Sequence, residues 1–318
     1  AFFADLRLPE PDFHLGIGSG THAEQTAGVM VAYEKILMDT PPDWIVVVGD
    51  VNSTIACTLA AKKLCLSVAH LEAGLRSGDW AMPEEINRIV TDSIADVLWT
   101  PSVDGDENLT REGVAADRIS FVGNIMIDSY ELMRDQIEKA GTREALGLTA
   151  SGYGVVTLHR PSNVDHPETL SRLIDTLVTV STDLPLVFAM HPRTRKNIET
   201  HGYLKRLESA ENIRVTEPMS YINFLSLVRE AKMVLTDSGG IQEETTYLGI
   251  PCLTLRDTTE RPITVTQGSN RLVTPENLEE MIAKVVAGDW PTGRKPDLWD
   301  GRTAGRIAAD IKRRTAKK

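Results

Sequence analysis

Acidic side chains follow two strand-like apolar runs of the sequence. The run in "DWIVVVGD" ends at Asp50, and the run in "SVAHLEAG" reaches Glu72. A third carboxylate, Glu84, stands at the start of the helix-like stretch "MPEEINR". An acidic residue in such a place often caps a helix or pairs with a basic side chain. Several of them gathered at one sheet edge can instead remove and return a proton, so these three are candidate general acids and bases.

The stretch "VLTDSGGIQEE", residues 234–244, has the pattern of an anion site. A strand-like run ends at an Asp, turns through Ser238, Gly239 and Gly240, and enters a helix. Small residues let backbone N–H groups approach a phosphate at a helix N-terminus. The chain has neither a Walker A motif nor GxGxxG, so the usual P-loop and dinucleotide fingerprints do not apply. A tight turn that packs a helix on a sheet is the structural alternative, but a nucleoside diphosphate fits the serine and the glycines better.

Histidine and arginine side chains supply possible partners for an anion. His159 and Arg160 end the strand-like run in "TLHRPSN", and Arg261 lies between a Glu and a Pro in "LRDTTERP". A single histidine is more often structural, but its strand-end position favours a functional role for His159. The charges of "HPRTRK", residues 191–196, are by default solvated. No His, Cys or Asp group has metal-ligand spacing and no GxSxG turn is present, so neither a metal site nor a serine triad is expected.

Almost the whole chain alternates strand-like apolar runs with amphipathic helical stretches. Such alternation predicts parallel sheets covered by helices on both faces, with ligands at the carboxyl ends of the strands. We expect two doubly wound, Rossmann-like α/β domains facing across a cleft. Residues 1–124 plus 302–318 form the first and carry the carboxylates, and residues 125–301 form the second, with a linker at 288–301. Strands are predicted at 43–50, 67–74, 97–102, 118–124, 154–160, 185–192, 212–218, 233–239 and 251–257, and helices at 53–64, 83–95, 167–182, 220–231, 241–248 and 302–316.

Composition limits the class of protein. The 318 residues suffice for two domains with substantial cores, and 42% of them are apolar and 25% charged, as in an ordinary globular protein. The formal charge of −11 argues against nucleic acid or a membrane as a partner. No apolar run reaches the length of a membrane span. Three cysteines without a CxxC pair indicate a reducing, cytoplasmic compartment.

Nine segments carry a more specific signal when they are taken in chain order. They are "VGDVNSTIA", "HLEAGLRSGD", "MPEEINR", "VGNIMIDS", "LHRPSNVD", "HPRTRK", "LTDSGGIQEE", "LGIPCLTLRDTTERP" and "GSNRLV". Through them the chain resembles the non-hydrolysing UDP-N-acetylglucosamine 2-epimerases over almost its whole length. The resemblance implies the glycosyltransferase-B architecture, with the active site between two Rossmann-like domains. It also implies a cytoplasmic homodimer that interconverts UDP-N-acetylglucosamine and UDP-N-acetylmannosamine without a redox cofactor.

The reaction implied by the resemblance accounts for the residue types. The proton at C2 of the sugar is not next to a carbonyl group, so its direct removal is prohibitively hard. If UDP leaves first, an oxocarbenium-like centre at C1 acidifies the C2–H bond, and a carboxylate takes the proton. This leaves 2-acetamidoglucal and UDP in the site, and their recombination with protonation of the other face inverts C2. Such a path needs a diphosphate cradle and carboxylates beside the sugar.

The resemblance also assigns roles. Asp50, Glu72 and Glu84 form the acid–base group, and His159, the fourth catalytic residue, lies near the departing phosphate. The other expected site residues bind substrate: Ser238, Gly239 and Gly240 at the diphosphate, Glu244 at the ribose hydroxyls, Tyr221 and Phe224 at the uracil, and Arg88, His191 and Arg261 elsewhere in the site.

Two features depart from the family pattern. Members open with a strand and a "GTRPE" turn whose Arg reaches the phosphates, and this chain has no such turn. From the usual size of a βαβ unit, about two strands of the first domain are expected to be missing, which would leave a sheet edge or helix face uncovered near Asp50. In "LHRPSN", Pro161 and Ser162 replace an Arg and a Glu that many bacterial members carry in a segment linked to activation by a second UDP-N-acetylglucosamine. Such activation is therefore not assumed.

Several alternatives stay open. The substrate could be a modified UDP-sugar, such as a UDP-diacetamido-uronic acid, or the glucal could be hydrolysed to free N-acetylmannosamine. A glycosyltransferase of the same architecture would have an acceptor groove in place of the acidic cluster. Outside the enzymes, a UDP-sugar-binding remnant without catalytic activity fits the absent N-terminal turn.

Overall fold

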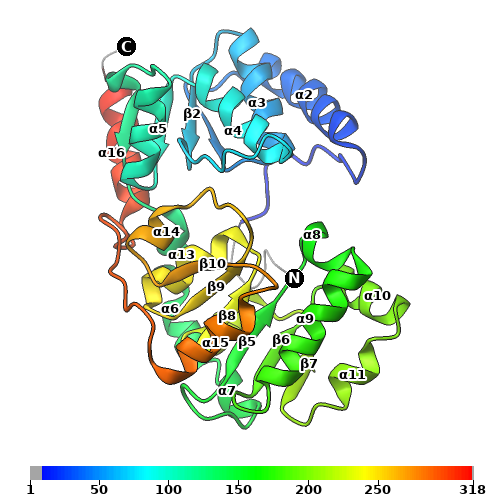
Figure 1. Cartoon of the computed structure of the whole chain (residues 1–318). Coiled ribbons are helices and arrows are strands. Elements are labelled where there is room, and N and C mark those ends of the chain that lie inside the picture. The colour runs from blue at the N-terminus through cyan, green and yellow to red at the C-terminus, as the bar shows by residue number, and fades with distance from the viewer. Residues whose placement is uncertain (1–8, 317–318) are drawn as a thin grey trace. The chain divides into compact units, whose positions relative to one another are not determined.

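Parallel β-sheets form the cores of two α/β units in the computed structural model, which describes residues 9–316 (Figure 1). Residues 9–129 and 297–316 make one unit, and residues 130–296 make the other. The first change of unit falls within α6 (Ile125–Lys139) and the second falls in the segment 288–301, which contains no helix or strand. The predicted α/β class with two parallel sheets is confirmed.

The first unit contains a four-stranded sheet in the order β1-β2-β3-β4, and all of its neighbouring strands are parallel. Its strands are β1 (Ile45–Val48), β2 (Val68–Leu71), β3 (Val97–Thr100) and β4 (Ile119–Phe121). Its helices are α2 (His22–Asp39), α3 (Asn52–Lys63), α4 (Pro83–Ile94), α5 (Val103–Arg111), the short η1 (Ala116–Arg118), the start of α6, and α16 (Thr303–Thr315).

Apolar side chains form two separate clusters around this sheet. Leu37 of α2 and Leu109 of α5 belong to one of them, together with small alanines of α3. Trp99 of β3 belongs to the other, against which Ile307 of α16 packs. The indole Nε1 of Trp99 also donates to Oδ2 of Asp310 at 2.9 Å, so α16 is held to this sheet by both packing and a buried hydrogen bond.

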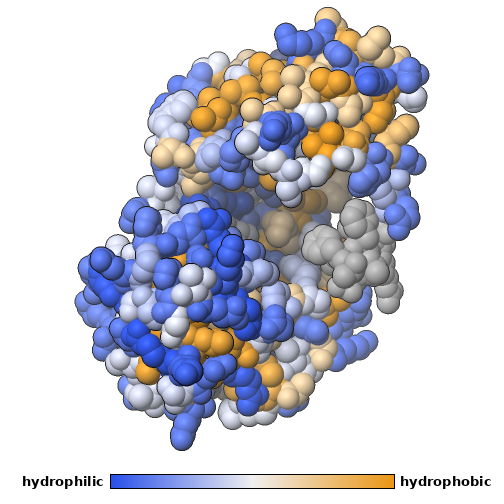
Figure 2. Space-filling view, turned by 90° about the vertical axis from the view of Figure 1, so that its right-hand side faces the viewer, coloured by the Kyte–Doolittle hydropathy of each residue, from blue (hydrophilic) through white to orange (hydrophobic). Residues whose placement is uncertain are grey.

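The strand β1 is an edge strand, because among residues 9–316 it pairs with β2 only. Its alternate side chains Val46 and Val48 are 44% and 49% exposed, and Val31 and Met38 of α2 are exposed as well. Figure 2 shows apolar side chains gathered on the surface of this unit. The uncovered sheet edge expected near Asp50 is thus confirmed.

The second unit contains a six-stranded parallel sheet in the order β10-β9-β8-β5-β6-β7. Its strands are β5 (Gly154–Thr157), β6 (Leu186–Ala189), β7 (Ile213–Thr216), β8 (Met233–Thr236), β9 (Cys252–Leu255) and β10 (Asn270–Val273). Its helices, after the rest of α6, are α7 (Thr142–Ala145), α8 (Pro161–Val164), α9 (Pro167–Val180), α10 (Pro192–Thr200), α11 (Leu204–Glu208), α12 (Tyr221–Val228), α13 (Gly239–Leu248), α14 (Ile263–Thr266) and α15 (Leu278–Ala287).

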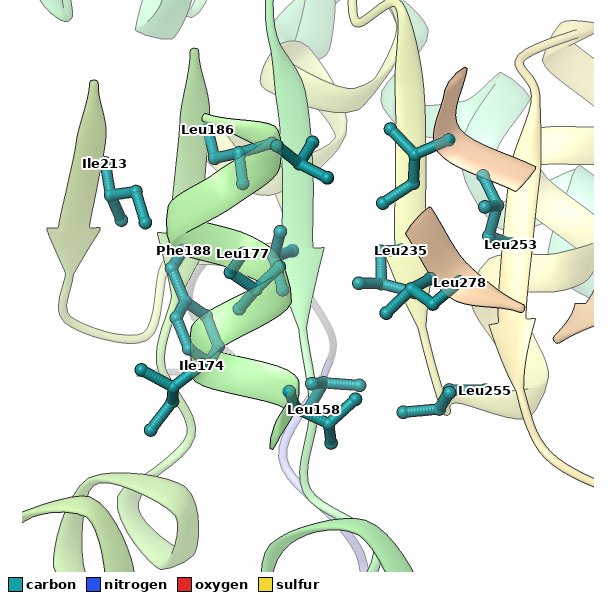
Figure 3. Packing of buried hydrophobic residues seen from close by; sticks show 14 of the residues in the cluster. Leu158, Ile174, Leu177, Leu186, Phe188, Ile213, Leu235, Leu253, Leu255 and Leu278 are labelled. Carbon is teal, nitrogen blue, oxygen red and sulfur yellow. The ribbon is translucent and has the colours of Figure 1, made fainter. Parts of the chain in front are cut away.

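Leucine and isoleucine side chains of α9 and α15 cover one face of this sheet (Figure 3). Ile174 and Leu177 of α9 pack with Phe188 of β6, and Leu278 of α15 packs with Leu235 of β8 in the same cluster. The chain leaves β5 through α9 towards β6 but leaves β8 through α13 towards β9, on the other side of β5. Ligands of open parallel sheets bind at the carboxyl ends of the strands where the connections diverge in this way. The ends of β5 and β8 are therefore the expected ligand position of this unit.

Local sequence explains several element ends. At the start of α2, the Thr21 hydroxyl accepts a hydrogen bond from the Glu24 N–H, and the Glu24 carboxylate accepts one from the Thr21 N–H. The helices α13 and α15 end at Gly249 and Gly288, whose left-handed backbone (φ 73° and 79°) suits glycine.

Every strand and helix predicted from the sequence is present, with bounds within a few residues. β10 and several helices were not predicted from the sequence, namely α2, α5, α6, α10 and α15 and the short α7, α8, α11 and α14. β10 reads "NRLV", and its first residue, Asn270, is polar because it takes part in a buried hydrogen-bond network described below.

Candidate functional site

Asp50 and Glu72 lie at neighbouring strand ends of the first sheet. Val48 of β1 is paired with Leu71 of β2. Glu72 follows this pair directly, and Asp50 follows it by two residues. The Gly49 N–H continues the ladder by donating to the Leu71 carbonyl at 3.0 Å. The structure therefore brings these two predicted carboxylates to one edge of one sheet.

Glu72 has a left-handed backbone with φ 70°. This conformation costs a residue with a Cβ about 1–3 kcal/mol, and such strain gathers at functional sites. The turn is closely packed against α5: a Cβ added to Gly74, itself at φ 80°, would lie 2.5 Å from the Gly105 carbonyl oxygen. The packed turn thus holds Glu72 in an orientation that an ordinary strand end would not give.

Arg88 is the partner of Asp50. Its Nη1 lies 2.5 Å from Oδ2 of Asp50, and its Nη2 lies 2.6 Å from Oε2 of Glu85. Arg88 is only 1% exposed, so in this structure the guanidinium orients Asp50, although the sequence analysis expected it to contact substrate. Burial opposes ionisation of Glu85, but the Ser77 and Gly78 N–H groups and Arg88 keep its pKa below the usual value.

A fully buried histidine connects this strand end to α4. Nδ1 of His70 lies 2.6 Å from Oδ1 of Asp92, and Nε2 lies 2.8 Å from the Gly49 carbonyl oxygen. Both partners accept hydrogen bonds, so both ring nitrogens carry a hydrogen. Burial disfavours the charged ring, yet Asp92 and the Gly49 carbonyl outweigh it and raise the pKa of His70. This pair was not predicted from the sequence, where its only signal is a histidine inside an otherwise apolar strand.

Glu84 lies in the first turn of α4, where the helix dipole favours a carboxylate. It lines a pocket of about 370 Å³ together with Val51 and Asn52 at the start of α3 and Gln25 of α2. The Asn52 side-chain amide donates to the Gln25 side-chain oxygen at 2.8 Å, and this hydrogen bond holds the two residues together at the edge of the pocket. Because Val51 follows Asp50 directly, the third predicted carboxylate lines a pocket next to Asp50.

In the second unit, the predicted anion site forms the start of α13. Ser238 is the N-cap residue and Gly239 is the first residue of this ten-residue helix. The Ser238 hydroxyl makes no capping hydrogen bond with residues 9–316. The first backbone N–H groups of α13 therefore have no side-chain cap, and a helix start of this kind offers them to an anion.

Arg261 approaches the start of α13 because residue 239 has no side chain. A Cβ on Gly239 would lie 2.7 Å from Nη1 of Arg261 and 2.7 Å from Oε1 of Glu260. Nε of Arg261 lies 2.9 Å from Oε2 of Glu243, and Glu260 pairs with the same guanidinium. Burial opposes ionisation of Glu260, but Arg261 and Arg256 lower its pKa to about 2. Glu243, to which the sequence analysis gave no role, thus orients a predicted site residue.

His159 and His191 follow the adjacent strands β5 and β6, and their ring centroids are 5.4 Å apart. Nδ1 of His191 accepts a hydrogen bond from the Arg193 N–H at 3.2 Å, so this nitrogen carries no hydrogen. Burial and the neighbouring His159 lower the pKa of His191. The structure therefore brings these two predicted residues together at the strand ends named above.

Glu244 and Tyr221 form a buried polar pair in the same unit. Glu244 is 4% exposed, and burial together with Glu243 raises its pKa to about 8, against the effect of Tyr221. Neither the Tyr221 hydroxyl nor Oε1 of Glu244 has a hydrogen bond of normal geometry to a residue within 9–316. Unsatisfied buried polar atoms are rare, and they are expected where a ligand completes the network. Phe224 lies one turn along α12 from Tyr221 and is half-buried.

A buried amide network supports the start of α13 and was missed by the sequence analysis. The Gln242 side-chain oxygen accepts hydrogen bonds from Thr259 (2.8 Å) and from Asn270 (3.0 Å). The Gln242 amide nitrogen donates to the Ser238 carbonyl at 3.2 Å. Asn270, on β10, also accepts from Thr254 at 2.7 Å. These hydrogen bonds connect three of the sequence motifs, "DSGGIQEE", "RDTTERP" and "GSNRLV".

No group of three or more His, Cys, Asp or Glu side chains in residues 9–316 could hold a metal ion. Every helix in that range is too short or too polar to cross a lipid bilayer.

Two helix-covered parallel sheets with polar residues at their carboxyl ends define an α/β protein of the glycosyltransferase-B type. Sucrose-phosphate synthase from Thermosynechococcus elongatus shares this fold, with a TM-score of 0.63 at 13% identity over 95% of this chain and 81% of that one. The model of the UDP-N-acetylglucosamine 2-epimerase family matches residues 1–312. The chain therefore belongs to this family of isomerases.

Two relatives with named activities share about 40% sequence identity with this chain. UDP-N-acetylglucosamine 2-epimerase of Methanocaldococcus jannaschii is 43% identical over 289 residues, which cover 89% of this chain and 79% of that protein. Its crystal structure in complex with UDP-GlcNAc and UDP matches with a TM-score of 0.85 over 96% of this chain and 86% of that one, at 39% identity. UDP-2,3-diacetamido-2,3-dideoxy-D-glucuronate 2-epimerase of Pseudomonas aeruginosa is 39% identical over 276 residues, covering 86% of this chain and 75% of that protein.

Proposed function

We propose that this protein inverts C2 of UDP-N-acetylglucosamine to give UDP-N-acetylmannosamine, and catalyses the reverse reaction. The observation that carries the proposal is the pair of carboxylates at adjacent strand ends, Asp50 and Glu72. One is oriented by the buried Arg88 and the other by a strained turn. The name of the Methanocaldococcus jannaschii relative and its complex with UDP-GlcNAc and UDP support the choice of substrate.

The proposed reaction proceeds by elimination and re-addition. The bond from C1 to the UDP oxygen breaks while a carboxylate of the first unit takes the C2 proton, which leaves 2-acetamidoglucal and UDP. UDP then adds back to C1 and a second acidic group delivers a proton to the opposite face of C2. Protons and leaving group balance over the cycle, and no oxidant is consumed. Asp50, Glu72 and Glu84 are the groups assigned to the two proton transfers.

The second unit is assigned to UDP. The uncapped start of α13, formed by Ser238, Gly239 and Gly240, faces the diphosphate, and Arg261 adds positive charge there. His159 acts on the departing phosphate, with His191 beside it. For the nucleoside, Glu244 accepts hydrogen bonds from the ribose hydroxyls, and Tyr221 and Phe224 line the uracil position.

The assembly and the compartment are further parts of the proposal. We infer a homodimer, which multi-angle light scattering of the purified chain would show as a mass close to twice 35.0 kDa. We also infer a cytoplasmic location, because the resemblance to the family implies one. The proposal includes no metal and no redox cofactor.

One experiment tests the reaction directly. The protein is incubated with UDP-N-acetylglucosamine in D₂O, and C2 of the sugar is followed by NMR. Epimerisation predicts deuterium at C2 together with UDP-N-acetylmannosamine. Free N-acetylmannosamine would instead indicate hydrolysis, and tight UDP binding without exchange would indicate a non-catalytic binding protein. Glu72→Gln should abolish exchange with little change in UDP affinity, whereas Glu280→Gln, at a surface ion pair with Lys284, should behave as wild type.

A second substrate has support from a specific comparison. The Pseudomonas aeruginosa relative is named for a diacetamido-glucuronate sugar, at an identity close to that of the other relatives. The same exchange assay with UDP-2,3-diacetamido-2,3-dideoxy-glucuronate decides between the two. A higher kcat/KM for the uronate would transfer the proposed activity to that sugar and leave the reaction class unchanged.

A further inference from the structure

Among the buried carboxylates of residues 9–316 outside the proposed chemistry, Asp237 is the one in contact with a proposed catalytic residue, His159. Asp237 follows β8 directly and its side chain is 0% exposed. The carboxylate accepts hydrogen bonds from the N–H groups of His159 (3.1 Å) and Arg160 (2.9 Å) and from the side-chain amide of Asn163 (3.0 Å). Burial of a carboxylate costs free energy, and these hydrogen bonds offset that cost. A structural or functional role for Asp237 is therefore expected.

Asp237 also contacts the ring of His159. Nδ1 of His159 lies 3.0 Å from Oδ1 of Asp237. Burial disfavours an ionised Asp237, but His159, Asn163 and the Arg160 N–H together keep its pKa below the usual value. An ionised carboxylate can only accept, so the hydrogen between the two groups belongs to Nδ1. The other ring nitrogen, Nε2, is then the one left for a ligand.

The sheet register places this pair at the ligand position of the second unit. Thr157 of β5 is paired with Thr236 of β8, and His159 and Ser238 each follow two residues after that pair. His159 therefore lies alongside the N-cap of α13, and its side chain is 40% exposed although its partner is buried. On the other side, the ring of His191 is 5.4 Å away, centroid to centroid. His159 thus has a buried, ionised partner at Nδ1, whereas the ring remains accessible to solvent. Imidazole rings that are oriented for function are commonly held in this way.

We propose that Asp237 is a positioning residue that holds the hydrogen of His159 on Nδ1 and turns Nε2 towards the diphosphate of the substrate. In the imidazolium form of the ring, the Nε2–H group then donates a hydrogen bond to a phosphate oxygen as the bond from C1 breaks. The identity of the ligand in this inference rests on the proposed function. The position of the hydrogen on the His159 ring does not.

The state of the ring can be measured without a mutation of Asp237. Long-range ¹H–¹⁵N spectra of the protein labelled at its seven histidines report which ring nitrogens carry hydrogen. His159→Gln identifies the His159 signals by their loss. We expect Nδ1 of His159 to be protonated in the wild-type protein without ligand. A ring with hydrogen on Nε2 only would overturn the proposal whether or not the protein is an epimerase.

Asp237→Asn tests the consequence, because it keeps the size of the side chain and removes its charge. We expect the Nδ1–H preference of His159 to be lost and kcat for C2 exchange to fall at least about 10- to 100-fold, the loss typical when the hydrogen-bond partner of a metal-ligating histidine is removed. UDP affinity should change less than about threefold. Asn163→Ser is the matched control: it removes one hydrogen bond from the same carboxylate without touching His159, and should keep both the ring state and kcat.

The readouts separate the two ideas. If the wild-type protein does not exchange C2, the proposed function fails, and the ring state alone decides the role of Asp237. If Asp237→Asn exchanges at the wild-type rate, or if Asn163→Ser is equally slow, Asp237 is structural and the proposal is wrong. A kcat loss confined to Asp237→Asn, together with a changed ring state, supports it.

Discussion

Nη1 of Arg88 lies 2.5 Å from Oδ2 of Asp50, and this contact joins the middle of α4 to the end of β1. Arg88 is 1% exposed, whereas the Asp50 side chain is 28% exposed. The guanidinium also neutralises the buried Glu85, which in turn accepts hydrogen bonds from the Ser77 and Gly78 N–H groups. One buried cation therefore fixes both a candidate catalytic carboxylate and the turn before α4.

Arg88→Met should be strongly destabilising. Without the guanidinium, Glu85 is left as an uncompensated buried charge, a change that typically costs about 3–5 kcal/mol. Arg88→Lys keeps the charge but cannot hold two carboxylates with one planar fork, so an intermediate loss of stability and a slower C2 exchange are expected. Urea unfolding followed by circular dichroism measures the first, and the NMR assay measures the second. If the Arg88→Met variant has the same urea unfolding midpoint as the wild type, the ion pairs of Arg88 do not contribute to the stability of the fold.

His70 should make stability depend on pH. Its pKa is raised in the folded protein, so its contribution is fully present below its unfolded value of 6.5 and is lost as the pH rises through the higher folded value. Asp92 has a lowered pKa, so its contribution fades only when the pH falls below about 3.8. The difference in unfolding free energy between wild type and His70→Gln should therefore be largest near pH 5.5 and smaller at pH 9.

The matched control for this measurement is His14→Gln, at an exposed position in the first unit. Its difference from wild type should be small at both pH values. If the His70→Gln difference is the same at pH 5.5 and pH 9, the buried ring does not carry the charge that its two acceptors require.

Gly239→Ala should weaken UDP binding. The new methyl group would lie 2.7 Å from Nη1 of Arg261 and from Oε1 of Glu260, so it must displace the ion pair that borders the start of α13. We expect at least about a tenfold loss of UDP affinity by calorimetry, which corresponds to about 1.4 kcal/mol. Gly305→Ala in α16 is the control, since nothing lies within 4 Å of its added Cβ and alanine favours helix. Equal UDP affinities for the Gly239→Ala variant and the wild type would remove Arg261 from the anion site.

The sheets, and the strand-end positions of several candidate site residues, could be predicted from the sequence for a simple reason. Parallel strands bury both faces, so they appear as continuous apolar runs such as "MVLT" and "VLWT", and a polar residue that ends such a run stands out. Asp50, Glu72, His159 and Asp237 were all visible in this way. The predicted sheet edge near Asp50 followed from the family pattern and is present at β1.

The residues that hold the site in place were much harder to predict. His70, Asp92, Gln242 and Asn270 act through partners that are distant in sequence, and spacing along the chain gives no sign of these contacts. Arg88 illustrates the same limit: its motif was recognised, yet only the structure shows that its guanidinium is buried between Glu85 and Asp50. Positioning contacts are set by packing between elements, and no single segment encodes them.

Glu244 should couple stability and UDP binding to pH. Its folded pKa is raised to about 8 from an unfolded value of 4.5, so between these pH values the folded state holds a proton that the unfolded state has released. Stability should therefore fall as the pH rises from about 4.5 to about 8 and then level off. Glu244→Gln removes this dependence, and its unfolding free energy relative to wild type should increase over the same range.

The same proton reports on the ribose contact. If the ribose hydroxyls donate to Glu244, UDP binding favours the ionised carboxylate, so binding near pH 7 should release a proton from the wild-type protein. Calorimetry in two buffers of different ionisation enthalpy measures that release, and Glu244→Gln should reduce it. An equal proton release from both proteins would show that UDP does not reach Glu244, and the buried pair with Tyr221 would then serve the fold alone.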